Sequence, residues 1–234
     1  MQIVALEQEW FEIIILPLLS TNWNFMKKIL LISAVNLLLL TCVKIKGQPI
    51  PIELMMGNNY GAVNLAFSKD FSQTSRLGFF HQNTIEFDYN EPEKNSFFLQ
   101  DLLYVETFKN LRVAGGVAYS RGGFAPTLGL QYVYVSEKLL FLCAPRINIV
   151  EDPSYDIMTI LQYKPEINEK LKLYTRIQLL NVFDAAGNIR SYQWLRLGLE
   201  MKGIQFGLAL NLDEYGPSPS VEGNYGLFVR KEIF

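Results

Sequence analysis

Apolar and polar residues alternate one by one over long stretches of the chain that follows residue 48. In GIQFGLALNLD, residues 203–213, every second position from Ile204 to Leu212 is apolar, and the positions between are polar or small. SYQWLRLGLEM, residues 191–201, repeats the pattern. A period of two places alternate side chains on opposite faces of a β-strand. These segments therefore predict strands with one wholly apolar face.

Similar segments fill much of residues 48–234, and we find no convincing helix among them. They include YGAVNLAFS, LRVAGGVAYS, TLGLQYVYV, LLFLCAPRINI and KLKLYTRIQL. Strands of soluble proteins average about 5 to 6 residues, whereas tilted strands that cross a membrane need about 9 to 11. Tight turns such as Lys109-Asn110 and Lys202-Gly203 separate the segments. Because hydrocarbon offers no partner to an unpaired strand edge, the pattern predicts an all-β, closed, antiparallel up-and-down transmembrane β-barrel.

The strand count and the ends of the barrel follow from the connections. Eleven segments are clear, and the alternation of residues 50–56 before Gly57 supplies a short first strand. We predict twelve strands, with ten and fourteen as the alternatives. Connections near residues 90–95, 151–155, 184–188 and 214–220 look longer, and we expect them outside the cell. Those near 109–110, 136–138 and 202–203 are tight, and we expect them in the periplasm.

The first 47 residues are set apart from the barrel by their composition. Met26, Lys27 and Lys28 precede an uncharged run, residues 29–43, which has the length of a signal-peptide apolar region and is too short for a spanning helix. Residues 1–25 carry three glutamates ahead of it. We predict an upstream mis-start or disordered extension over 1–25, a signal peptide over 26–47 and the barrel over 48–234. A lipoprotein signal ending at Cys42 is the alternative.

Composition and charge exclude several classes of function. The chain is 50% hydrophobic, 13% aromatic and 19% charged, which is not the composition of a disordered protein. Its net charge is −2 and it has no run of basic residues, so no nucleic-acid partner is expected. Cys42 and Cys143 form neither a disulfide framework nor a zinc motif. We expect no metal and no cofactor.

The last ten residues, YGLFVRKEIF, carry the most specific signal. They make the chain resemble bacterial outer-membrane β-barrel proteins as a class, without singling out a narrower family. In that class the last strand commonly ends on an aromatic residue that the insertion machinery reads. Phe234 matches this residue, with Phe228 and Tyr225 upstream. The resemblance implies location in the outer membrane of a Gram-negative envelope, with membrane lipid and the barrel-assembly machinery as partners. Lys231 falls on the predicted lipid side, where it must lie near the interface.

If the apolar face is outward, a set of charged residues faces the lumen. Six are acidic and six are basic: Glu86, Asp88, Glu106, Arg112, Arg146, Lys172, Arg176, Arg196, Glu200, Asp213, Arg230 and Glu232. A strongly ion-selective pore shows one sign in excess at its constriction. The balance favours pairs across the lumen, and a polar conduit for small solutes stays open as the alternative. Gly116, Gly129, Gly198 and Gly207 are expected on the same side, where they allow the strands to bend.

Catalytic chemistry has little support. His81 is the only histidine, it falls on the apolar side, and no His-x-Ser or Asp-x-His pair surrounds it. We predict a structural role for His81. Two residues do not fit a regular barrel: Pro145 requires a bulge, and Asp101, which faces lipid in our register, suggests a slip in its strand.

Aromatic residues near segment ends predict the girdles that flank the apolar band of a membrane barrel. They are Tyr89, Phe108, Tyr119, Tyr134, Tyr163, Tyr192 and Tyr225.

The sequence thus predicts an outer-membrane barrel that is either a narrow, porin-like channel for transport of small solutes or a structural part of the envelope. Two alternatives are a soluble, lipocalin-like calyx with its apolar face inward and a lipid-modifying barrel enzyme.

Overall fold

The computed structural model describes residues 50–233, apart from residues 73 and 219. The predicted extension, residues 1–25, and the predicted signal peptide, residues 26–47, lie outside the described residues. The described part consists almost entirely of strands, with one short 3₁₀ helix, η2 (Pro92–Lys94). The strands are β1 (Ile50–Gly57), β2 (Tyr60–Asp70), β3 (Leu77–Asp88), β4 (Ser96–Phe108), β5 (Leu111–Ser120), β6 (Gly123–Val135), β7 (Leu139–Asn148), β8 (Ser154–Tyr163), β9 (Glu166–Asn168), β10 (Leu171–Asp184), β11 (Gly187–Met201), β12 (Ile204–Tyr215) and β13 (Ser220–Ile233).

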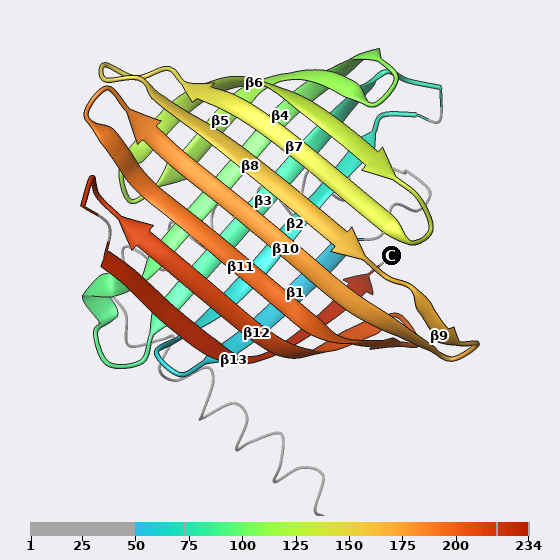
Figure 1. Ribbon diagram of the computed structural model, residues 1–234. Coiled ribbons are helices and arrows are strands. Elements are labelled where there is room, and N and C mark those ends of the chain that lie inside the picture. Colours follow the sequence, from blue (N-terminus) through green and yellow to red (C-terminus); the bar gives the residue numbers. More distant parts are fainter. Residues whose placement is uncertain (1–49, 73, 219, 234) are drawn as a thin grey trace, which may run out of the picture. The chain divides into compact units, whose positions relative to one another are not determined.

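The strands form a closed antiparallel barrel (Figure 1). Apart from the short β9, each strand pairs with the next along the chain, and β13 closes the sheet on β1 through pairs that run from Ile50–Ile233 to Gly57–Gly226. The short β9 pairs only with the end of β10 and lies outside the ring, so β8 pairs directly with β10. The barrel therefore has twelve strands, and the predicted fold class and strand count are confirmed.

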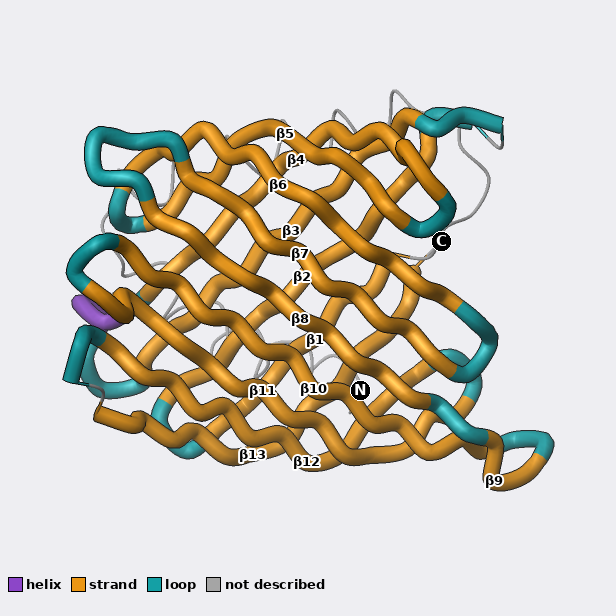
Figure 2. Tube along the Cα trace, turned by 45° about the horizontal axis from the view of Figure 1, so that its top comes forward, coloured by secondary structure: helices purple, strands orange, loops and turns teal. Residues whose placement is uncertain are grey.

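An even number of strands puts the start of β1 and the end of β13 at the same end of the barrel, which we call the terminus end. The tube view shows the connections gathered at the two ends (Figure 2). The terminus end carries the connections 71–76, 109–110, 136–138, 164–170 and 202–203, and the opposite loop end carries 58–59, 89–95, 121–122, 149–153, 185–186 and 216–219.

The predicted contrast in connection length is only partly observed. The connection expected to be long near 184–188 is the tight turn 185–186, and the terminus end includes the long connection 164–170 with β9. The residues that look like a loop in the sequence continue the strand ladder, because Asp184 pairs with Gly187. Connection length alone therefore does not distinguish the two ends.

The sidedness of the strands is as predicted. Leu208 and Leu227 are each 62% exposed on the outer wall, whereas Arg196 is 4% exposed and Asp213 is 4% exposed in the interior. A calyx for an apolar ligand requires the reverse arrangement. No helix within the described residues is long and apolar enough to cross a membrane.

Glycines permit close approach of neighbouring strands in the wall. Gly198 on β11 pairs with Gly207 on β12. A Cβ on Gly198 would lie 2.1 Å from the carbonyl oxygen of Phe206, and one on Gly207 would lie 2.3 Å from that of Leu197. Real Cβ atoms do not approach backbone atoms so closely. The pairing of β11 with β12 at this position therefore requires residues without a side chain.

Two expected irregularities are absent. The bulge expected at Pro145 does not form: β7 pairs with β8 without a shift, and on the β6 side the register is the same before and after a gap opposite Pro145. The missing proline donor is thus accommodated by an interruption in one ladder. The slip expected at Asp101 is also wrong, because β3 and β4 pair continuously and Asp101 lies opposite His81.

Candidate functional site in the barrel interior

A buried carboxylate surrounded by three arginines forms the centre of the interior. Glu53 on β1 is 1% exposed, and its carboxylate lies 2.9 Å from Arg196 Nε, 3.4 Å from Arg176 and 3.9 Å from Arg230. These residues reach it from β10, β11 and β13. Arg196 also donates to Asn211 Oδ1, and Arg176 donates to Gln178 Oε1. Arg230 makes no hydrogen bond with the described residues, and its Nε is buried without a partner. One carboxylate is thus shared by three guanidinium groups, and positive charge is in excess in this cluster.

A second network lies nearer the loop end. Arg190 Nη2 on β11 lies 2.6 Å from Asp213 on β12 and 3.4 Å from Glu86 on β3, so this ion pair crosses the interior. Tyr60 donates to the other oxygen of Asp213 and accepts from Asn211. Asn211 connects this network to the arginines around Glu53.

The third network is on the opposite wall. Arg146 on β7 lies 2.5 Å from Asp156 on β8 and also donates to Gln100 on β4. Arg146 and Asp156 are 6% and 5% exposed. Because both charges are buried and paired, loss of either one alone is costly.

Further ion pairs lie toward the terminus end. Lys164 bridges Glu200 and Glu232, at 3.1 and 3.7 Å. Lys172 pairs with Glu166 at 3.4 Å, and Arg112 approaches Glu106 at 4.0 Å and donates to Ser68. Charged pairs therefore occur along the whole height of the interior.

Apolar side chains fill the interior between these networks. One cluster, on β3 to β8, includes Phe80, Leu102 and Met158. A second, on β1, β2, β10, β12 and β13, includes Tyr174 and Phe228, whose ring centroids are 5.6 Å apart. Both Tyr174 and Phe228 are almost fully buried. Side chains of the strands themselves thus narrow the interior of the barrel.

At the loop end the interior opens into a cavity of about 790 Å³, which we call the vestibule. Arg146, Asp156, Arg190 and Glu86 lie among its lining residues, together with polar groups from the connections. Lys94 is on its rim, and its hydrogen bond to Glu91 raises the pKa of the lysine. The vestibule therefore connects the charged interior of the barrel with the space outside its loop end.

One member of the predicted aromatic girdle is misplaced. Tyr192 points inward, is 6% exposed and stacks on Trp194 with ring centroids 4.4 Å apart. It shares the even-numbered face of β11 with Arg190 and Arg196, so strand parity overrides its position near the segment end. The exposed girdle residues are Tyr89, Phe108, Tyr134, Tyr163 and Tyr225, and Tyr119 is half-buried.

The structure places all the charged residues predicted to face the lumen on the inward side of their strands. It brings them together with four charged residues that were not predicted from the sequence: Glu53, Asp156, Lys164 and Arg190. Parity could have found three of these, because Glu53 is on the same face of its strand as Pro51 and Met55, Asp156 on the same face as Met158, and Arg190 on the same face as Tyr192. Lys164 follows the end of β8, where no periodicity applies. The part that each lumen residue plays in function stays a prediction.

Residues proposed for the assembly signal lie on different faces. Phe228 is buried inside and Tyr225 is 65% exposed outside. Phe234 lies outside the described residues, so recognition of this strand by the assembly machinery remains a prediction.

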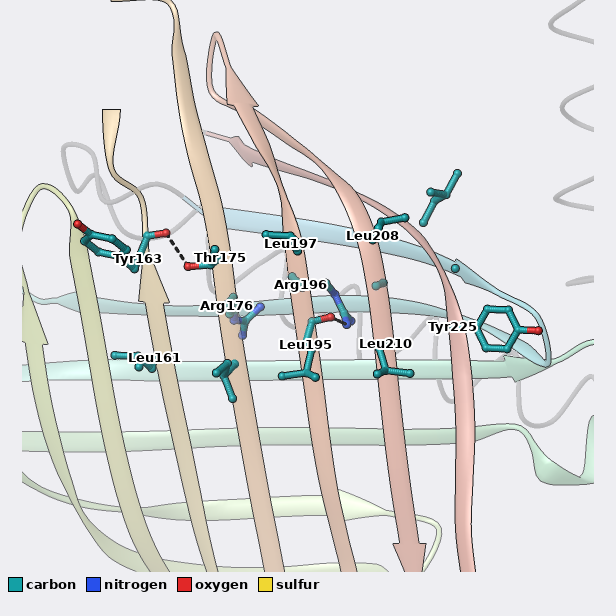
Figure 3. Close-up of a pocket in the computed structure, with 14 residues that line it drawn as sticks. Leu161, Tyr163, Thr175, Arg176, Leu195, Arg196, Leu197, Leu208, Leu210 and Tyr225 are labelled. Atoms are coloured by element: carbon teal, nitrogen blue, oxygen red, sulfur yellow. Dashed lines mark hydrogen bonds between the residues drawn. The ribbon is translucent and has the colours of Figure 1, made fainter. Parts of the chain in front are cut away.

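The outer wall has an apolar concavity of about 750 Å³ across β8 and β10 to β13. The close-up shows Leu195, Leu197, Leu208 and Leu210 along β11 and β12, with Tyr225 at one side (Figure 3). Its surface is almost wholly hydrocarbon, and it lacks the convergent polar groups that fix a specific ligand. We assign this surface to acyl chains.

A polar pair interrupts the outer wall on β3 and β4. His81 Nδ1 lies 2.7 Å from Asp101 Oδ1, and the His81 ring contacts the rings of Phe67 and Phe79. The strand register puts Phe67, Phe79, Asn83, Leu99 and Leu103 around the pair on the same face. None of these described neighbours has a hydroxyl or thiol nucleophile, so the pair lacks the third member of a hydrolytic site.

The closed sheet, the apolar outer wall and the charged interior define the class of protein: a transmembrane β-barrel with a narrow polar lumen. No known protein family matches the sequence, and neither does any curated protein. Among solved structures, a KdgM porin in complex with disordered oligogalacturonate is similar over 80% of this chain and 100% of that chain, at 10% sequence identity and a TM-score of 0.46. A NanC porin covers the same shares at 11% identity and a TM-score of 0.48. The outer membrane protein opdK from Pseudomonas aeruginosa is similar over 70% of this chain and 65% of its own, at 12% identity and a TM-score of 0.35.

Within the part of the chain that the structure describes, no group of three or more histidine, cysteine or carboxylate side chains is arranged to hold a metal ion. Cys143 is a free thiol, half-buried on β7.

Proposed function

We propose that the chain is an integral barrel of the bacterial outer membrane that passes small polar solutes through its charged lumen. The observation that carries the proposal is the continuity of charged pairs along the interior, from the vestibule through Glu53 to Lys164. A purely apolar filling would have been sufficient to close the barrel, and buried ion pairs contribute little net stability compared with apolar residues. Polar groups at every level provide partners for a hydrated solute.

Passage requires movement of side chains. Tyr174, Phe228 and the arginines around Glu53 belong to the wall, and their rotamer changes are the steps that would admit a solute. We therefore expect a small conductance with a frequently closed state, and solutes smaller than those of wide porins.

A permanently closed, structural barrel is the second candidate. The complete burial of Tyr174, Leu102 and Met158 favours it, because these side chains pack as in a stable core.

Current through a planar lipid bilayer tests the two candidates. A conduit gives discrete current steps from the purified chain, and Phe228→Ala gives larger steps because it removes a ring from the passage. Leu227→Ala is the matched control, since Leu227 is the next residue on β13 and faces outward. Electrical silence of both the wild type and Phe228→Ala contradicts the conduit and supports the closed barrel.

A further inference from the structure

The two ends of the barrel differ sharply in their unpaired charges. Each of the five connections at the terminus end carries a basic residue that is exposed and makes no ion pair with the described residues: Arg76, Lys109, Lys138, Lys170 and Lys202. These residues are far apart in the sequence, and only the up-and-down topology brings them to one end.

Two further lysines lie on the outer wall at the same end. Lys69 is near the end of β2 and pairs in register with Phe79, an outward residue, and Lys231 near the end of β13 is exposed beside Ile233. Neither has an ion-pair partner in the described part of the chain. Both side chains can reach from the apolar wall to the level of the turns, as lysines at a membrane interface do.

The loop end has the opposite character. Its connections carry Glu93, Glu151 and Asp152 without ion pairs, and Asp184 ends β10 at the same level. Lys94 is paired with Glu91, and Arg121 donates to the backbone oxygens of Glu93 and Asn95. Unpaired carboxylates at the terminus end are fewer: Glu137, Glu169 and Asp70, and Asp70 accepts a hydrogen bond from Tyr104. The cations are thus in excess at one end only.

We propose that these seven basic residues form a belt that binds the phosphate groups of anionic phospholipids in the leaflet at the terminus end. The five connections join successive strand pairs of the closed ring, so their basic residues are distributed around this end, and Lys69 and Lys231 lie on the lipid side itself. Basic side chains near a membrane surface attract anionic lipids, and this attraction weakens with salt. The belt anchors the height of the barrel in the bilayer and selects its nearest lipids.

The inference rests on the membrane placement given above and is independent of conduction. The test is electron paramagnetic resonance of the full chain in phosphatidylcholine vesicles with a trace of spin-labelled phosphatidylglycerol or spin-labelled phosphatidylcholine. The motionally restricted fraction measures which lipid contacts the protein. We expect the wild type to restrict phosphatidylglycerol several-fold more than phosphatidylcholine, and we expect 1 M salt to reduce the preference.

The double variant Lys69→Gln/Lys231→Gln removes the two cations on the lipid side, and its preference is expected to fall from several-fold to less than about twofold. Lys69→Arg/Lys231→Arg keeps the charge and should keep the preference, which separates charge from folding. Lys94→Gln/Arg121→Gln removes two cations from the loop end and should change nothing. Equal restriction of the two lipids by the wild type, or the same loss in the loop-end control, overturns the belt. A chain that restricts no lipid at all contradicts the membrane placement as well.

Discussion

At the scale of single residues, the interior depends on a few charges that have no substitute. Glu53 is the only carboxylate in contact with Arg176, Arg196 and Arg230 among the described residues. Attraction to three guanidinium groups offsets the desolvation of this carboxylate. The carboxylate is in turn the only counter-charge of the three arginines among the described residues. Removal of Glu53 therefore leaves three guanidinium groups without a counter-charge.

Glu53→Gln is expected to lower the free energy of unfolding by about 3 to 5 kcal/mol, because three buried guanidinium groups lose their counter-charge. Urea unfolding of the barrel refolded in detergent measures this. Glu222→Gln is the control: Glu222 is exposed on β13 and makes no ion pair with the described residues, so its loss should change stability by no more than about 0.5 kcal/mol. Equal effects of the two changes would contradict the central role of Glu53.

The pair of His81 and Asp101 is a second residue-scale case, since it lies on the apolar side of the wall. Asp101→Ala leaves His81 without its partner, and we expect a loss of about 3 kcal/mol. The double change His81→Phe/Asp101→Leu should be close to neutral, because apolar residues can replace a buried pair without cost. Unfolding midpoints of the two variants at matched detergent concentration provide the comparison. A double variant as unstable as Asp101→Ala would indicate that the pair has a role beyond mutual compensation.

At the scale of elements, the strands pack so closely in places that side-chain volume decides whether they can pair. The pair of Gly198 on β11 and Gly207 on β12 is one such place. Leu197 and Phe206 carry the backbone oxygens that occupy the space a Cβ would need. The close pairing of β11 and β12 at this point therefore depends on the absence of side chains.

Gly198→Ala is expected to destabilise the barrel by about 1 to 3 kcal/mol, because the new methyl group would displace the backbone of β12. Gly115→Ala is a suitable control: its Cβ would make only an ordinary 3.5 Å contact with Leu128 on the outer wall. Urea titration of both variants, followed by tryptophan fluorescence, measures the difference. If Gly115→Ala were the more harmful change, the crowding argument would fail.

At the scale of the whole molecule, the apolar outer wall requires an apolar environment, which a lipid bilayer or a detergent micelle provides. Large apolar residues are exposed on the outward face of the strands, among them Phe124 and Leu130 on β6 and Leu208 on β12. A soluble monomer does not expose apolar surface of this extent.

We expect the protein to stay with the cell envelope after washes with high salt and alkaline carbonate, and to leave it only with detergent. Immunoblots of the membrane and supernatant fractions measure this. A soluble periplasmic protein of similar size serves as the control for release. Appearance of the chain in the supernatant without detergent would favour the calyx hypothesis.

Much of this architecture could be predicted because a strand obeys a strict period of two. The alternation in residues 191–201 and 203–213 is sufficient to assign Leu197 and Leu208 to one face and Arg196 to the other. That assignment needs no knowledge of which strands are neighbours. The number of strands followed from counting such segments and from the requirement for closure.

Predictions based on position within a segment, rather than on parity, were less successful. Tyr192 lies near a segment end but faces inward, and the expected bulge at Pro145 is replaced by a gap in one ladder. Asp101 keeps its register because His81, on the neighbouring strand, supplies the partner that the sequence pattern did not reveal.

By itself the sequence determined the strands, their apolar face and the parity that directs most of the charged side chains into the lumen, because these follow from local backbone geometry. Only the tertiary structure decided which charges meet, since Glu53 reaches Arg196, 143 residues away, through closure of the ring. The same closure gathers the unpaired lysines at one end, because antiparallel strands return each alternate turn to the same side.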